Sequence, residues 1–311
     1  MTKPELGNSV FLVGATASGK SSVGVCLAET IGGEIISLDS MQLWRGMDVG
    51  TAKPSAEDRA RVPHHLIDLL EPCESFSVAR YVELACAAVR EIDGRGRVPL
   101  FVGGTALYLK ALTAGLFKGP PADWGLRNEL REIAARHGSA FLHERLRGVD
   151  PDAADRIHPN DLRRIIRALE VLDKTGTPIS QLQQQWRKAQ GKAGPPIFGI
   201  DRERDDLYNR IDRRVDQMMS GGFLDEARRL LESNPGREAL QALGYRELIA
   251  FLRGEISELA EAVGLIKRNT RRFAKRQLTW FRAFPQIVWV AAHPGDSPGE
   301  VAGRIIGRME E

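Results

Sequence analysis

The stretch FLVGATASGKSSVG, residues 11–24, decides how this chain is expected to fold. From Gly14 to Ser21 it matches G-x-x-x-x-G-K-[ST], the phosphate-binding P-loop, between an apolar strand-like run and a helix-compatible run. The glycines let consecutive backbone N–H groups point at one anion, the helix N-terminus adds its positive end, and Lys20 supplies a full charge. We therefore predict a diphosphate site made by the whole loop: Gly14, Ala15, Thr16, Ala17, Ser18, Gly19, Lys20 and Ser21.

The loop also predicts one cofactor. The hydroxyl of Ser21 can bind a Mg²⁺ ion that bridges phosphate oxygens, so Ser21 is the predicted metal ligand. The motif is blind to the group that carries the phosphates, because ATP, GTP or another diphosphate ester would satisfy it.

Further apolar runs at 34–39, 98–104, 193–201 and 286–292 read as strands, and the segments between them can hold helices. This alternation is typical of an α/β fold, here a P-loop NTPase-like parallel sheet flanked by helices. The breaker-rich stretch GPPADWG begins a region of helical period, which predicts a small all-helical insertion domain. The predicted boundaries are 1–118 for the first part of the core, 119–192 for the insertion and 193–311 for the second part.

Capping residues refine the helices of the insertion. Asp123 is suited to begin a helix that Gly138 ends, and Asn160 is suited to begin the helix DLRRIIRALEVLDKTG. In the core, we expect the helix TALYLKALTAG to pack through Leu107, Leu109 and Leu112.

Composition indicates an ordinary globular protein: 311 residues, 42% hydrophobic and 27% charged, with a net charge of +3. The N-terminal region has one short apolar run, too short for a membrane span, so we expect a cytoplasmic protein without a membrane partner. Three cysteines without CxxC spacing and the adjacent pair His64 and His65 predict neither a disulfide framework nor a metal centre. A monomer is the simplest expectation.

Asp39 ends the predicted strand EIISLD, which places it at the same sheet edge as the P-loop. It could hold magnesium as a Walker-B aspartate does, or take a proton from a nucleophile close to the bound phosphate. A capping role in a turn is the third interpretation.

Residues 267–282 contain seven Lys or Arg and no acidic residue. At helical spacing these cations form two adjacent columns, Lys267, Arg271 and Lys275 beside Arg268, Arg272 and Arg276. We expect the opposite side of the helix to face the core through Ile266, Phe273, Leu278 and Phe281. Like charges stacked in columns favour a polyanion, so we interpret the stripe as an RNA surface, with a solvated helix face as the alternative.

Eight motifs in order along the chain resemble those of the tRNA dimethylallyltransferases, also called tRNA isopentenyltransferases. They are GATASGKS, DSMQ, DVGTAKPS, VPHHLID, FVGGTALY, RIHPNDLRRIIRALEV, LQALGYRE and KRQLTWFR, which together run from Gly14 to Arg282. Ala15 and Ser21 depart from the proline and threonine that are frequent in the family, and both departures are compatible with the chemistry.

The resemblance implies that the P-loop binds dimethylallyl diphosphate instead of splitting ATP. The five-carbon group would pass to the exocyclic N6 amine of adenosine 37, 3′ of the anticodon, in tRNAs that read codons beginning with U, with release of diphosphate. It also implies that Asp39 is the general base and that Thr105 and Arg214 hold the leaving group. From the residues alone, Thr105 could equally cap a helix, Arg214 could be a surface charge, and its neighbour Arg213 is hard to tell from it.

By the same resemblance the partner is the tRNA anticodon stem-loop. The residues it assigns to tRNA contact are Ser40, Met41, Gln42, Arg127, Arg163, Arg164, Arg167, Gln241, Gly244, Tyr245, Arg246, Lys275, Arg276, Gln277, Trp280 and Arg282. Two rival functions remain. A small-molecule kinase would use the loop and Asp39 but leave the basic stripe without a use, and a non-catalytic RNA-binding P-loop protein would leave Asp39 and Thr105 without a role.

Overall fold

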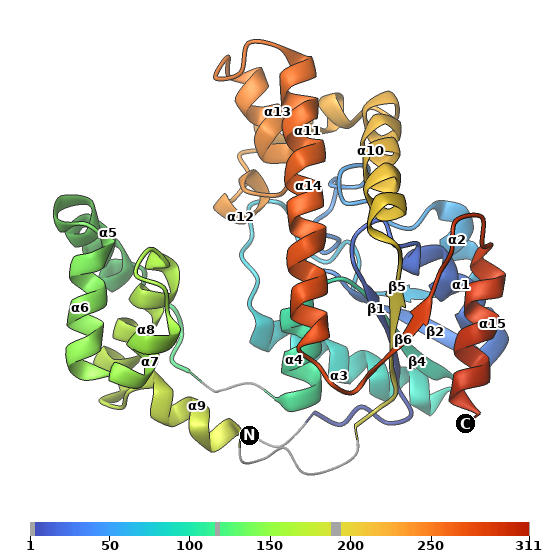
Figure 1. Cartoon of the computed structure of the whole chain (residues 1–311), viewed down its shortest axis with the longest axis horizontal. Coiled ribbons are helices and arrows are strands. Elements are labelled where there is room, and N and C mark those ends of the chain that lie inside the picture. Colours follow the sequence, from blue (N-terminus) through green and yellow to red (C-terminus); the bar gives the residue numbers. More distant parts are fainter. Residues whose placement is uncertain (1–3, 116–118, 188–193, 311) are drawn as a thin grey trace. The chain divides into compact units, whose positions relative to one another are not determined.

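The computed structural model describes residues 4–115, 119–187 and 194–310. The chain divides into two compact units (Figure 1). Of the described residues, 4–113 and 194–310 form one unit, and 114–115 with 119–187 form the other. The helical unit thus covers the region where the sequence predicts an insertion at 119–192.

The larger unit is built on one six-stranded sheet in which every neighbouring pair is parallel. The spatial order is β3-β2-β4-β1-β5-β6. The strands are β1 Val10–Gly14, β2 Gly33–Leu38, β3 His64–His65, β4 Val98–Gly103, β5 Ile197–Asp201 and β6 Ile287–Ala291. The predicted α/β fold is confirmed. The sequence missed β3, because a two-residue strand carries no periodic pattern.

Helices cover the sheet, which explains why the strands β1 and β2 are buried along their whole length. The side chains of α1 Lys20–Ile31 and α15 Pro298–Met309 share one core cluster with β1, β4 and β5. The helix α3 Val78–Gly94 packs against β2 and β4, where the hydroxyl of its buried Tyr81 donates to the Ser37 carbonyl at 2.9 Å. A short helix, α2 Ala56–Arg61, precedes β3.

In α4 Ala106–Ala114, Leu109 and Leu112 are fully buried as expected. Leu107 is not part of the core, since 48% of its surface is exposed. It lies two residues before Leu109, about 200° away around the helix, so the two side chains cannot share one face.

The remaining helices of this unit extend beyond the carboxyl ends of the strands, where β5 leads into α10 (Figure 1). They are α10 Arg204–Ser220, α11 Phe223–Glu232, α12 Arg237–Leu240, α13 Tyr245–Leu252 and α14 Leu259–Arg282. Phe223 and Tyr245 pack edge to face with ring centroids 4.9 Å apart. They anchor a second apolar cluster that also takes in Trp44 and Met47 from the chain after β2. This cluster supports the loops at the carboxyl ends of the strands.

The smaller unit is entirely helical over its described residues, with α5 Trp124–His137, α6 Ser139–Val149, α7 Pro151–Arg156, α8 Leu162–Thr175 and α9 Ile179–Arg187. Asp123 caps α5 by accepting the Leu126 N–H at 3.0 Å, and Gly138 ends that helix, as predicted. The prediction for Asn160 is wrong. The next residue, Asp161, caps α8 by accepting the Arg164 N–H at 3.2 Å, while the Asn160 N–H donates to the ring of His158.

Among the described residues, none of the helices combines the length and the apolar character that crossing a membrane requires.

Candidate active site at the phosphate loop

The predicted P-loop joins β1 directly to α1. Gly19 stands at the helix start with φ of +93°, in the left-handed region that glycine enters without strain. Gly14 has no room for a side chain, because a Cβ there would lie 2.9 Å from the Ser18 hydroxyl. Steric constraints therefore explain why glycine stands at both positions of the motif. Ala17 also adopts a positive φ, +63°, which an alanine does not favour, so its conformation must be held by its surroundings.

Two arginines that the sequence analysis missed hold this part of the loop. Arg210 donates from Nε to the Ala17 carbonyl at 2.9 Å, and Arg202 donates from Nε to the Ser18 carbonyl at 2.7 Å. Carbonyls held on the outside of a loop turn the peptide units so that N–H groups can face inward, toward an anion. The spacing of Arg210 and Arg214, four residues apart on one helix face, is the sequence signal that could have found the first of them.

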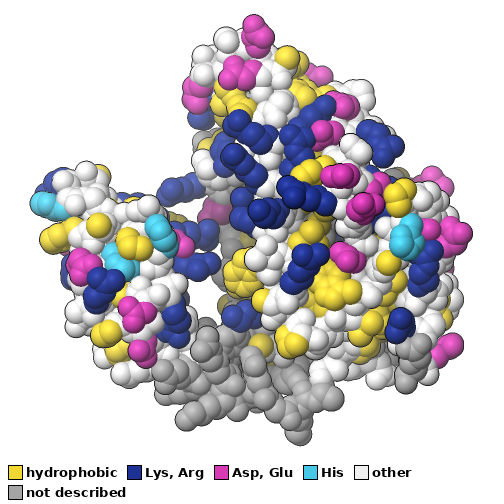
Figure 2. Space-filling model, in the orientation of Figure 1, with side chains coloured by type: hydrophobic (Ala, Val, Ile, Leu, Met, Phe, Trp, Pro, Cys, Tyr) yellow, Lys and Arg dark blue, Asp and Glu magenta, His cyan; other side chains and the backbone are white. Residues whose placement is uncertain are grey.

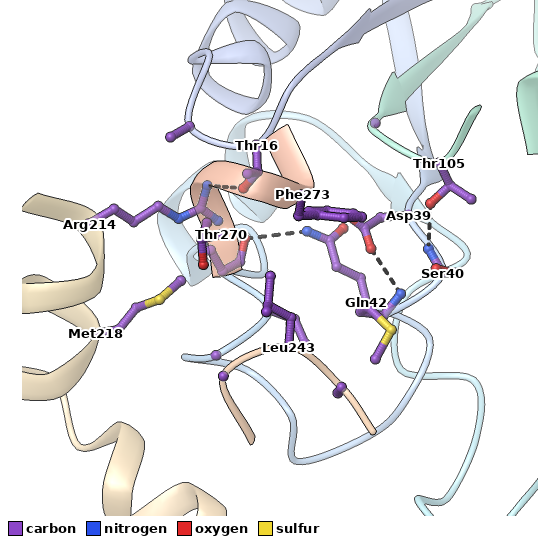
Figure 3. Close-up of a pocket in the computed structure, with 18 of the residues that line it drawn as sticks. Thr16, Asp39, Ser40, Gln42, Thr105, Arg214, Met218, Leu243, Thr270 and Phe273 are labelled. Carbon is purple, nitrogen blue, oxygen red and sulfur yellow. Dashed lines mark hydrogen bonds between the residues drawn. The ribbon is translucent and has the colours of Figure 1, made fainter. Parts of the chain in front are cut away.

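Of the two adjacent arginines, Arg213 and Arg214, it is Arg214 that reaches the loop. Its Nη1 lies 3.5 Å from the Thr16 hydroxyl, and burial lowers the pKa of its guanidinium (Figure 3). Arg213, which sequence reasoning could not separate from it, is exposed and donates to the Asn209 carbonyl of its own helix. The geometry thus distinguishes the two neighbours.

Lys20 is a half-buried cation that lies near other charges. Burial and the neighbouring Arg214 lower the pKa of its ammonium from 10.5 to about 8, while the nearby Asp39 raises it. Its Nζ donates to the Ala15 carbonyl at 3.3 Å, a long contact for a full charge. Two cations held together against burial create a strong local preference for a bound anion.

Asp39 and Thr105 meet at the tips of the neighbouring strands β2 and β4 (Figure 3). Oδ1 of Asp39 accepts the Met41 N–H at 2.8 Å. The Thr105 hydroxyl accepts the Ser40 N–H at 3.1 Å, and the Thr105 N–H donates to the Leu38 carbonyl at 3.1 Å. Thr105 is thereby fixed beside the aspartate through its side chain and its backbone.

Lys20, Asp39, Thr105 and Arg214 line one cavity of about 550 Å³ within the larger unit. The polar part of its wall includes Thr16, Lys20, Ser21, Asp39, Thr105 and Arg214, and the apolar part includes Met41, Ile211, Met218, Leu243, Ile266 and Phe273. The structure therefore brings together the predicted phosphate loop and the three predicted catalytic residues. It also adds an apolar compartment that the sequence analysis did not predict.

One wall of the cavity, residues 50–52, is held in place by a buried carboxylate that the sequence analysis missed. Glu226 accepts the N–H groups of Asp48, Val49 and Gly50 at 2.8–2.9 Å and the hydroxyl of Tyr245 at 2.5 Å. Ala52 in turn accepts the Gln42 side-chain amide at 3.3 Å. Glu226 thus fixes the segment against which Gln42 rests.

Three of the residues predicted to contact tRNA are buried. Tyr245 is fully buried, because its ring packs on Phe223 and its hydroxyl binds Glu226. Gln277 is 7% exposed, and its amide links the Thr16 N–H to the Gly104 carbonyl. Gly244 is also buried. All three residues also line the cavity, so for them tRNA contact stays a prediction.

Gln241, Arg246, Ser40, Met41 and Gln42 line the cavity, so for them tRNA contact stays a prediction.

In the helical unit, two of the four predicted arginines have a structural role. Arg127 pairs with the fully buried Glu170 at 2.8 Å, and Arg167 pairs with the same carboxylate at 2.5 Å. Removing either would leave part of a buried charge uncompensated. Arg163 and Arg164 are exposed on α8, and their contact with tRNA stays a prediction.

The basic stripe is present on α14, but its cations differ in whether they are paired with acidic residues. Lys267 pairs with Asp216 at 2.6 Å and Arg271 with Asp212 at 2.7 Å, so these two cations are already neutralised by α10. The exposed cations on the helix are Arg268, Arg272, Lys275, Arg276 and Arg282, and Trp280 is exposed beside them. Figure 2 shows the basic side chains gathered over this helix.

The prediction that Phe273 faces the core is wrong. Its side chain is 38% exposed and lines the cavity, next to Arg276.

The comparisons with known proteins agree with this geometry. A family model described as IPP transferase matches residues 42–284, and one described as isopentenyl transferase matches residues 8–65. These matches define the class of the protein, an isopentenyl-transferring enzyme. A tRNA dimethylallyltransferase of Desulforudis audaxviator is 49% identical over 304 residues, which are 97% of each chain. The chain belongs to the tRNA dimethylallyltransferase family.

Two solved structures are similar over nearly the whole chain. The tRNA isopentenylpyrophosphate transferase of Bacillus halodurans has a TM-score of 0.70 and 43% identity, with 98% of this chain and 97% of that one covered. A eukaryotic dimethylallyltransferase, described as acting on tRNA, has a TM-score of 0.79 and 26% identity, with 96% of this chain and 77% of that one covered.

Proposed function

We propose that this enzyme transfers the dimethylallyl group of dimethylallyl diphosphate to the N6 amine of adenosine 37, on the 3′ side of the anticodon, in tRNAs that read codons beginning with U. The N6–C bond forms as the C–O bond of the donor breaks, and diphosphate leaves with the electron pair. The observation that carries the proposal is that Asp39, Lys20 and Arg214 line one cavity, with the carboxylate near both cations.

Asp39 is the general base in this proposal. An aryl amine is a weak nucleophile because its lone pair is shared with the ring, so removing a proton as the new bond forms lowers the barrier. The hydrogen bond from Met41 holds one oxygen of the carboxylate at 2.8 Å. That contact orients the side chain at the strand tip.

Lys20, Arg214 and Thr105 meet the charge that develops on the leaving diphosphate. Preorganised cations and hydrogen-bond donors stabilise such a transition state most when water is excluded from them. Lys20 and Arg214 are partly withdrawn from water, and burial lowers the pKa of both. Each is more stable when an anion is bound beside it.

The apolar part of the cavity suits a five-carbon chain. Met218, Leu243 and Phe273 point into the space in front of Arg214 and Asp39 (Figure 3). An isoprenoid tail that leaves water for such a wall gains roughly 0.8 kcal/mol for each buried methylene-sized group. This wall supports a prenyl donor over a nucleotide, whose ribose and base would require polar partners.

A magnesium ion fits the residues present. Ser21 and Asp39 offer hard oxygen donors on the wall that Lys20 shares, and no cluster of three or more His, Cys, Asp or Glu that could hold a metal occurs in the described part of the chain. An ion here would take the rest of its octahedral shell from diphosphate oxygens and water. It would supply positive charge to the leaving group.

RNA is proposed to approach across α14, because the basic surface and the cavity are continuous. Arg272 and Arg276 line the cavity and are also exposed on the helix. Turning a stacked adenine out of an anticodon loop costs a few kcal/mol, which backbone contacts to such cations offset.

The test is a transfer assay with magnesium, labelled dimethylallyl diphosphate and unmodified tRNA, with γ-labelled ATP as the parallel donor. Label is expected on adenosine 37 from the prenyl donor, and none from ATP. Asp39→Ala should abolish transfer while inorganic pyrophosphate still binds; lost pyrophosphate binding would instead favour the metal-holding role for Asp39. A tRNA with guanosine at position 37 and a tRNA that reads codons beginning with C are the controls for the base and for the codon class.

A further inference from the structure

Gln277 is buried and lines the cavity. Its Oε1 accepts the Thr16 N–H at 2.9 Å, and its Nε2 donates to the Gly104 carbonyl at 2.8 Å. Thr16 belongs to the loop that follows β1, and Gly104 lies between β4 and Thr105. One amide therefore bridges the carboxyl ends of two adjacent central strands, using both of its polar ends.

The surroundings are shaped for this side chain. A Cβ at Gly104 would collide with Nε2 of Gln277, so a glycine is required there for the amide to reach the backbone. Gln277 itself is 7% exposed, whereas its neighbours on α14, Lys275 and Arg276, are exposed. A helix turns about 100° per residue, which explains how one side chain points inward beside two that face solvent.

The two residues that Gln277 bonds lie next to different parts of the proposed machinery: Thr16 is in the phosphate loop, and Gly104 precedes Thr105. On one side, Thr16 carries the hydroxyl that Arg214 approaches at 3.5 Å. On the other, Thr105 follows Gly104 directly and holds the Ser40 N–H beside Asp39. Beyond the last pair of the β1–β4 ladder, Val13 and Gly103, Gln277 thus adds a side-chain link between the diphosphate loop and the corner that carries the carboxylate.

We propose that Gln277 is a positioning residue for prenyl transfer: it fixes the phosphate loop relative to the Asp39–Thr105 corner, and it does not contact RNA. The proposal rests on the proposed function. A displacement of about 1 Å between reacting groups can cost about 10²-fold in rate, so loosening this bridge is expected to be costly.

The test compares Gln277→Ala and Gln277→Glu with Thr279→Ala, a matched change at an exposed residue of the same helix. The measured quantities are kcat, KM for dimethylallyl diphosphate, Kd for inorganic pyrophosphate by calorimetry and Kd for an anticodon stem-loop RNA. Gln277→Ala should lower kcat/KM for the donor by about 10- to 100-fold and weaken pyrophosphate binding, with the RNA Kd unchanged. Thr279→Ala should match the wild type in all four.

Gln277→Glu adds a readout that a purely structural role would not move. The carboxylate can still accept the Thr16 N–H, but it places an oxygen against the Gly104 carbonyl and cannot donate to it. Lowering the pH from about 8 to about 6 protonates a buried carboxyl, whose pKa is raised by burial, and restores the donor. The activity of Gln277→Glu relative to the wild type should therefore rise as the pH falls.

A weaker RNA Kd with an unchanged donor KM and pyrophosphate Kd would overturn the proposal, and so would a pH-independent ratio for Gln277→Glu. If Gln277→Ala does not fold, the pH series of Gln277→Glu decides alone. Failure of the proposed function is a separate result, because there the wild type itself would transfer no prenyl group to tRNA.

Discussion

The hydroxyl of Tyr245 lies 2.5 Å from Oε1 of Glu226, and both side chains are buried. The same carboxylate accepts three consecutive backbone N–H groups from residues 48–50, so it receives four hydrogen bonds. A buried carboxylate is tolerated when its lone pairs are satisfied in this way. The pair therefore joins α11 and α13 to the loop that forms one wall of the cavity.

Tyr245→Phe is expected to lower the free energy of unfolding by about 1–2 kcal/mol, because it removes one donor from a buried carboxylate and leaves the ring packing intact. Urea denaturation measures this change. Tyr208→Phe, on the half-buried Tyr208 of α10, is the control and should change stability by less than about 0.5 kcal/mol. Affinity for the anticodon stem-loop should be unchanged in Tyr245→Phe; a weaker RNA Kd at unchanged stability would restore the sequence-based role of Tyr245.

The fold and the centre of the site could be predicted from the sequence because they follow from one rule. Parallel strands bring their carboxyl ends to the same edge, so the P-loop, Asp39 and Thr105 had to meet once three strands were recognised. The strand tips are local features, and each was visible as an apolar run that ends in Gly or Asp.

What could not be predicted depends on contacts far apart in the chain. Arg127 pairs with Glu170, 43 residues away, and Gln277 bonds Thr16, 261 residues away. Neither partner leaves a periodic signal near the residue that it holds. Motif positions alone therefore assigned both side chains to tRNA, whereas the structure shows that both bond to distant parts of the protein itself.

The ammonium of Lys20 predicts a pH dependence of donor binding. Its pKa of about 8 means that the free enzyme loses this charge above about pH 8, and a bound diphosphate must then recruit the proton again. Pyrophosphate affinity should therefore fall by up to about tenfold per pH unit above pH 8 in the wild type. Affinity falls as the pH rises because the protonated, charged form of Lys20 is the one that binds the anion.

Lys20→Arg is the matched comparison, because arginine keeps its charge throughout this range. Calorimetric titrations of both proteins are carried out at several pH values. The protonation of pyrophosphate itself affects both proteins equally, so it cancels in the comparison. The affinity for pyrophosphate should fall more steeply with pH in the wild type. Equal slopes would show that Lys20 does not titrate in this window.

Arg214 and Arg213 form a natural pair for testing the leaving-group clamp. Arg214→Ala should lower kcat/KM by roughly 10²- to 10³-fold, the usual cost of removing a preorganised charge from developing negative charge. Arg214→Lys should recover part of the rate, since it restores the charge without the planar fork. Arg213→Ala removes an exposed neighbour of the same type and should stay close to the wild type in steady-state kinetics. Equal losses in the two alanine variants would show that helix charge, and not the contact with Thr16, is what matters.

The unequal pairing along α14 predicts which cations RNA uses. Lys275 and Arg276 are exposed, whereas Lys267 and Arg271 are engaged by Asp216 and Asp212. In fluorescence anisotropy titrations at several salt concentrations, replacing both Lys275 and Arg276 by alanine should weaken RNA binding. It should also reduce the slope of log Kd against log salt by about 0.7 for each lost phosphate contact.

The matched double variant Lys267→Ala with Arg271→Ala removes the same formal charge, but it frees two aspartates that those side chains neutralise. Its salt slope should therefore change less than that of the first variant, since few counterions are released at a cation that is already paired. If the two double variants alter the slope equally, RNA binding depends on the total charge of the helix and not on the exposed cations Lys275 and Arg276.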